Sequence, residues 1–130
     1  MEISSSQFAD VVVAAPIGRV DHQSVGQLEA ALAPLVQRIG IAKGALVLDC
    51  TGIDYISSVG LRVLMIAARQ LRGTGAKLAV TDLQPVVAEI FAISRFDRVL
   101  EVFPSVNAAL AQFSPAASAA YGAGHPPGTA

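Results

Sequence analysis

The run Ala45-Leu46-Val47-Leu48 constrains the fold of this chain most, because it is apolar at every position and ends at the carboxylate of Asp49. A strand with one solvent-exposed face alternates apolar and polar residues, whereas a strand covered on both faces is apolar throughout. The run therefore predicts a central strand of a parallel sheet, with other elements packed on both faces of that sheet.

Segments with strand and helix patterns alternate on either side of this run. Strands are predicted at 11–17, 45–48, 77–80 and 99–103, with a further N-terminal strand at the sheet edge around residues 3–8. Apolar residues spaced by three and four predict helices at 25–39, 58–72, 85–91 and 106–113. This order predicts an α/β fold, with a mostly parallel sheet of four to five strands and about four helices.

The composition changes at Ser114. Residues 114–130 carry no formal charge and almost no large apolar side chain, so burial cannot offset the entropy lost on ordering them. The sequence therefore predicts a folded domain over residues 1–113 and a flexible tail over residues 114–130. Truncation after Phe113 is expected to leave the thermal stability nearly unchanged.

Charge and hydropathy exclude two classes of protein. Nine Lys and Arg against ten Asp and Glu give a net charge of −1, which leaves no basic excess for a nucleic-acid backbone. Charged residues interrupt the apolar runs before the roughly 18 to 20 residues that a spanning helix needs. The first residues also lack the charged and apolar regions of a signal peptide. We expect a cytoplasmic protein that neither binds nucleic acid nor inserts into a membrane.

No cofactor or metal site is expected. The single cysteine, Cys50, cannot form an internal disulfide, and His22 and His125 lack the spacing of metal ligands. Residues 73–77 look like a phosphate-binding loop, but they lead from a helix into a strand, the reverse of the order that such loops need.

An enzyme is not expected either. Ser58, His22 and either Asp49 or Asp54 could supply the residue types of a hydrolase site. The Gly-x-Ser-x-Gly turn that exposes such a nucleophile is absent from the sequence.

Residues 48–64 form the most informative stretch, because two adjacent hydroxyls, Ser57 and Ser58, lie where a helix begins after a buried strand and a loop. Functional groups of open α/β sheets gather beyond the carboxyl ends of the strands. The free N–H groups and the dipole at a helix N-terminus tolerate an anion, which suits a phosphate on a serine. A serine at this place also serves as an ordinary N-cap, and the two roles are compatible.

Three motifs make the chain resemble the STAS family, and specifically the bacterial anti-sigma-factor antagonists. They are Gly18-Arg19-Val20-Asp21, Leu46-Val47-Leu48-Asp49 and Ser57-Ser58-Val59-Gly60-Leu61. The resemblance covers residues 8–113 and implies the STAS fold. Alignment on Gly60-Leu61 implies that Ser58 is the phosphorylated residue. Ser57 stands where the family has an acidic residue and Val59 where it has a second hydroxyl, and both departures bear on kinase recognition.

The resemblance also implies a mechanism. The unphosphorylated domain would bind an anti-sigma factor that is also a Ser/Thr kinase, phosphorylation of Ser58 would reverse that binding, and a PP2C-type phosphatase would restore it. A constitutive STAS adaptor or scaffold, such as the cytoplasmic subunit of a lipid-transporting ABC system, is the alternative.

A partner surface is expected around Ser58. Besides the residues next to Ser58, it includes the side of the following helix that faces away from the sheet. The predicted partner-binding residues are Asp21, His22, Asp54, Ser57, Val59, Arg62 and Ile66. In the alternative reading, Val63 and Ile66 pack under a neighbouring loop.

Overall fold

A computed structural model describes residues 1–124 of the 130-residue chain. In chain order, its elements are β1 (Glu2–Phe8), β2 (Val11–Val20), α1 (Val25–Ala42), β3 (Ala45–Asp49), β4 (Ile53–Ile56), α2 (Ser58–Thr74), β5 (Lys77–Thr81), α3 (Pro85–Ile93), a 3₁₀ turn (Phe96–Arg98), β6 (Glu101–Phe103), α4 (Val106–Phe113) and α5 (Pro115–Gly124).

The main sheet has the strand order β1-β2-β3-β5-β6, and β4 pairs with the end of β2. β1 runs antiparallel to β2 at one edge, while the other pairs are parallel. β3 lies in the middle, and its Leu46 and Val47 are completely buried. The predictions of an α/β fold, of an N-terminal edge strand and of a central strand at 45–48 are confirmed.

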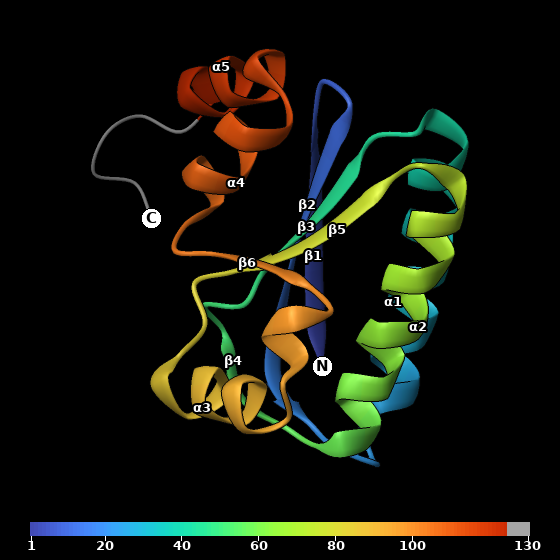
Figure 1. Cartoon of the computed structure of the whole chain (residues 1–130), viewed down its shortest axis with the longest axis vertical. Helices are drawn as coiled ribbons and strands as arrows, with labels where there is room; N and C mark the ends of the chain where they lie inside the picture. The colour runs from blue at the N-terminus through green and yellow to red at the C-terminus, as the bar shows by residue number, and fades with distance from the viewer. Residues whose placement is uncertain (125–130) are drawn as a thin grey trace.

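Helices cover the sheet on both faces (Figure 1). α1 and α2 lie side by side on one face, whereas α4 and α5 lie on the other, and α3 lies beside β4. The strand residues alternate accordingly: Val12 and Leu46 belong to the larger core cluster under α1 and α2, and Val11 and Val47 belong to the smaller cluster under α4.

Residues 1–124 contain six strands and five α-helices, against the expected four to five strands and about four helices. One added element is β4, where the sequence predicts a loop. It is only four residues long and pairs with the last residues of β2, through Gly18 with Ile53 and Val20 with Ile56. A strand this short depends on its partner strand, and no local pattern identifies that partner.

The other added element is α5, so the expected flexible tail is wrong for residues 115–124. Ser114 starts the helix, because its Oγ accepts a hydrogen bond of 3.1 Å from the N–H of Ala117. Ala117 is completely buried, and the ring of Tyr121 meets that of Phe8 edge-on at 5.1 Å. The small side chain of Ala117 lets α5 lie close to the sheet at this point. His125 and the residues after it lie outside the described residues.

We expect Ala117→Asp to destabilise the protein and Ala116→Asp to be harmless. Ala117 is buried against the sheet, so its replacement places an unpaired carboxylate there and should lower the free energy of unfolding by about 3 kcal/mol or undock α5. Ala116 is exposed in the first turn, where a negative charge is neutral to favourable. Urea unfolding of both variants measures the difference. Equal stability of the two would show that α5 is not docked.

Candidate functional site

The two serines differ in their roles at the start of α2. Ser57 is extended and caps the helix, since its Oγ accepts from the N–H of Gly60 at 3.4 Å. Its own N–H donates to the carbonyl of Val20 at 2.8 Å, which ties the helix start to the end of β2. Ser58 is the first residue of the helix and is exposed. The capping role therefore falls to Ser57, and the hydroxyl of Ser58 lies at the surface beside the positive end of the helix.

Gly60 allows this helix start to lie close to the sheet. A Cβ atom at Gly60 would come within 2.6 Å of Val20 Cγ1 and 2.8 Å of Ile56 Cγ1. Both neighbours are buried branched side chains with little freedom to move. The absence of a side chain at Gly60 thus fixes the position of the first turn and of Ser58 in it.

Asp21 organises the turn between β2 and α1. Its Oδ1 accepts from the N–H groups of Gln23 at 3.0 Å and Ser24 at 3.2 Å, and its Oδ2 accepts from Arg19 Nε at 3.1 Å. The hydrogen bond from Gln23, which outweighs partial desolvation, together with those from Ser24 and Arg19, holds the pKa of Asp21 below its ordinary value of 3.8. Asp21 is therefore ionised at neutral pH and adds negative charge near Ser57.

We expect Asp21→Asn to lower stability at neutral pH but not in acid. A carboxylate with a lowered folded-state pKa contributes stability above its unfolded pKa of about 3.8 and loses it as the pH falls through the folded value. The difference in free energy of unfolding between wild type and Asp21→Asn should therefore shrink as the pH falls below about 4. Urea titrations at several pH values measure it, and a difference that does not change with pH would contradict this role.

Arg19 and Tyr55 form a contact at this site that no sequence pattern predicts. The guanidinium carbon of Arg19 lies 4.0 Å from the ring centroid of Tyr55, in a cation–π arrangement. The two residues are register partners in the pairing of β2 with β4. Ile53, Tyr55 and Ile56 favour strands, but a run of four residues does not identify a strand without its partner β2.

Four of the predicted partner residues gather at the end of β2 and β4. Val20 pairs with Ile56, so Asp21 and Ser57, the residues that follow each strand, lie next to each other. Both are half-buried, whereas His22 in the turn and Asp54 on β4 are exposed.

The other three, Val59, Arg62 and Ile66, form an exposed stripe along α2. They follow one another at spacings of three and four, and Val59 and Ile66 are 42% and 41% exposed. Val63 is half-buried and packs against the core cluster rather than under a loop, whereas Ile66 is 41% exposed. Ile66 lies about 12 Å along the helix axis from Ser58.

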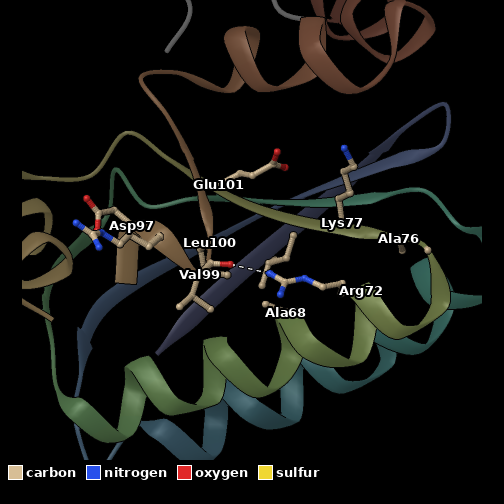
Figure 2. A pocket seen from close by; sticks show the side chains of 11 residues that line it. Ala68, Arg72, Ala76, Lys77, Asp97, Val99, Leu100 and Glu101 are labelled. Atoms are coloured by element: carbon tan, nitrogen blue, oxygen red, sulfur yellow. Dashed lines mark hydrogen bonds between the residues drawn. The ribbon is translucent and has the colours of Figure 1, made fainter. Parts of the chain in front are cut away.

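A hollow of about 470 Å³ lies elsewhere, between the second half of α2 and the strands β5 and β6 (Figure 2). Arg72, Lys77, Asp97 and Glu101 line it, and Arg72 Nη2 donates to the carbonyl of Val99 at 3.0 Å. Its charges are of both signs, so it favours no single class of ion. Its nearest α2 residue follows Ser58 by ten positions, about 15 Å along the helix.

Neither the thiol of Cys50 nor a cluster of metal ligands provides a reactive site within residues 1–124. Cys50 is 2% exposed, and burial, with smaller contributions from Asp49 and Asp82, raises its pKa to about 12. Its thiol is therefore uncharged at neutral pH and a poor nucleophile. Within residues 1–124, no group of three His, Cys, Asp or Glu side chains is placed to hold a metal ion, and no helix is long and apolar enough to span a membrane.

Known proteins resemble this chain over nearly its whole length. The model of the STAS domain family matches residues 2–109. BtrV of Bordetella bronchiseptica, which is named as an anti-sigma factor antagonist, is 37% identical over 116 residues, which cover 89% of this chain and 97% of BtrV.

Solved structures share the fold. A crystal structure from Thermotoga maritima, also named as an anti-sigma factor antagonist, has a TM-score of 0.77 at 14% identity and covers 85% of this chain and 93% of its own. The Bacillus cell fate determinant SpoIIAA in its phosphorylated form has a TM-score of 0.63 at 15% identity, over 85% of this chain and 98% of its own. With the family model matched from β1 to α4 and the fold reproduced, this chain belongs to the STAS domain family.

Proposed function

We propose that this chain is an anti-sigma factor antagonist that works as a phosphorylation-controlled partner switch. Unphosphorylated, it binds an anti-sigma factor that is also a Ser/Thr kinase. Phosphorylation of Ser58 releases that partner, and a PP2C-type phosphatase reverses the modification. ATP and magnesium belong to the kinase, and this chain is its substrate without an enzymatic activity of its own.

The observation that carries this proposal is the division of roles between the two serines. The hydroxyl of Ser57 accepts the hydrogen bond that caps the helix, while Ser58 is exposed at the end of the sheet. Support also comes from the name of BtrV and from the phosphorylated form of SpoIIAA, which shares the fold.

Charge explains how the modification would act. A phosphoserine carries about −1.5 to −2 charges at neutral pH. Here it would lie on the same sheet end as the carboxylates of Asp54 and Asp21, of which Asp21 is paired with Arg19. An interface that closes over a neutral hydroxyl would then have to bury several like charges, which favours release of the partner.

Phosphorylation by the proposed partner, an anti-sigma factor that is also a Ser/Thr kinase, tests the proposal. Incubation with that kinase, ATP and magnesium should add one phosphate to the intact mass, and fragmentation should locate it on Ser58. Ser57→Ala is the matched control, because it removes the neighbouring hydroxyl and should still be modified, whereas Ser58→Ala should not. A phosphate on Ser57 or Thr51, or none at all, would contradict the switch and favour the constitutive adaptor.

A further inference from the structure

Arg62 follows Ser58 by four residues on the exposed side of α2. Both residues are exposed, and this spacing makes them neighbours on one face of the helix, with Cβ atoms about 6 Å apart. The Cα–Cβ bonds of an α-helix tilt towards its N-terminus, so the side chain of Arg62 leads back over the turn that begins at Ser58. A guanidinium at this position lies within reach of a group attached to the Ser58 hydroxyl.

The guanidinium of Arg62 is unpaired within residues 1–124. It makes none of the ion pairs or side-chain hydrogen bonds found there, whereas the guanidinium of Arg19 is bound to Asp21 at 3.1 Å. Arg62 is also the only basic residue in the first three turns of α2. A cation that is both exposed and unpaired is free to bind an anion placed beside it.

The segments next to the start of α2 offer a phosphate little positive charge. Their titratable groups, from β2, the turn after it, α1 and β4, are those of Arg19, Asp21, His22, Glu29, Asp54 and Tyr55. The guanidinium of Arg19 is already held by Asp21 and lies over the ring of Tyr55. A phosphate on Ser58 therefore finds its counter-charge on α2 itself.

A phosphate on Ser58 would match the guanidinium in both charge and shape. The planar fork of an arginine binds two oxygens of one phosphate, and such charge-assisted hydrogen bonds are stronger than neutral ones. An anion placed four residues before a cation is also the favourable order along a helix. The unmodified hydroxyl is neutral, so this contact forms only after modification.

We propose that Arg62 holds the phosphate of Ser58 in the modified chain, as a positioning residue of the switch. The inference rests on the proposed phosphorylation of Ser58. Modification then also removes from the predicted partner surface the cation that Arg62 presents there, which adds to the effect of the new negative charge. The carboxylate of aspartate is one bond shorter than a phosphate and carries a single charge, so Ser58→Asp adds charge without reproducing this contact.

The ionisation of the phosphate tests the pair. Phosphoserine is incorporated at position 58 during synthesis of the full chain, so that no kinase is needed. Phosphorus NMR then follows its second ionisation, whose ordinary pKa is about 6. Arg62 favours the dianion, so Arg62→Gln should raise this pKa by about 0.3 or more, and Arg62→Lys, which keeps the charge, should restore most of the difference. Arg62 is exposed, so both variants should keep the fold, which thermal unfolding checks.

Arg69→Gln is the matched control. Arg69 is exposed on the same helix, but it lies about 16 Å from Ser58 along the axis, beyond the screening length of about 8 Å at physiological salt. The phosphate of this variant should titrate like that of wild type. The Nε–H resonance of Arg62 should also shift with the same pKa as the phosphate. A phosphate pKa that is equal in wild type and Arg62→Gln, or that rises as far in Arg69→Gln, would overturn the pair.

The pair and the proposed switch can fail separately. If the partner kinase leaves Ser58 unmodified, the proposed function fails, while titration of the incorporated phosphoserine still decides whether Arg62 holds it. If the kinase modifies Ser58 and the partner is released, but Arg62→Gln leaves the phosphate pKa unchanged, the switch works through charge alone and the role of Arg62 is wrong.

Discussion

Ser58→Asp is expected to weaken binding of the anti-sigma factor by about 2 to 4 kcal/mol, roughly 30-fold to 1,000-fold. The added carboxylate would be buried in the interface without a compensating charge, at the sheet end that also carries Asp21. The fold should survive, because a negative charge in the first turn of α2 is neutral to favourable by about 0.3 to 1 kcal/mol. Calorimetric titration with the purified partner measures the affinity, and thermal unfolding checks the fold.

Ser58→Asn is the matched control for this prediction. Asparagine has nearly the size of aspartate but no charge, so any loss of affinity in this variant is due to the shape of the side chain alone. Ser58→Ala should bind like wild type and lose only regulation. If Ser58→Asp binds as tightly as Ser58→Asn, charge does not drive release and the constitutive adaptor becomes the better account.

Gly60→Ala is expected to destabilise the protein by about 2 to 3 kcal/mol. The new methyl group would meet Val20 Cγ1 at 2.6 Å and Ile56 Cγ1 at 2.8 Å, and the first turn of α2 would have to move away from the sheet. Because Ser58 lies in that turn, the rate of its phosphorylation should also fall. Urea unfolding measures the loss of stability.

Gly73→Ala supplies the control on the same helix. A Cβ atom at Gly73 meets nothing within 4 Å, so this exchange should stabilise the protein by about 0.4 to 1 kcal/mol through the lower entropy of the unfolded chain. Opposite signs for the two glycines would separate a packing requirement from helix propensity. A neutral Gly60→Ala would show that the helix start can shift at little cost.

Features that depend on neighbours in the chain were predictable from the sequence. The apolar run at residues 45–48 predicted the central strand β3, and the spacing of apolar residues after Ser57 predicted α2 to within two residues of its end. Gly75, which follows α2, has a φ of 86° and provides the left-handed conformation that ends the helix. The three motifs of the resemblance likewise placed Ser58 at the start of α2.

Features that depend on contacts between distant segments were not predictable from the sequence. Four residues at 53–56 become β4 only because the end of β2 provides hydrogen-bonding partners, and Ala117 of α5 is buried only because the sheet offers a surface that it fits closely. Which serine caps α2 is likewise decided by tertiary contacts, since the hydrogen bond to the carbonyl of Val20 holds Ser57 at the cap. Sequence patterns report the preferences of a segment alone, whereas these outcomes depend on the free energy gained when two remote surfaces meet.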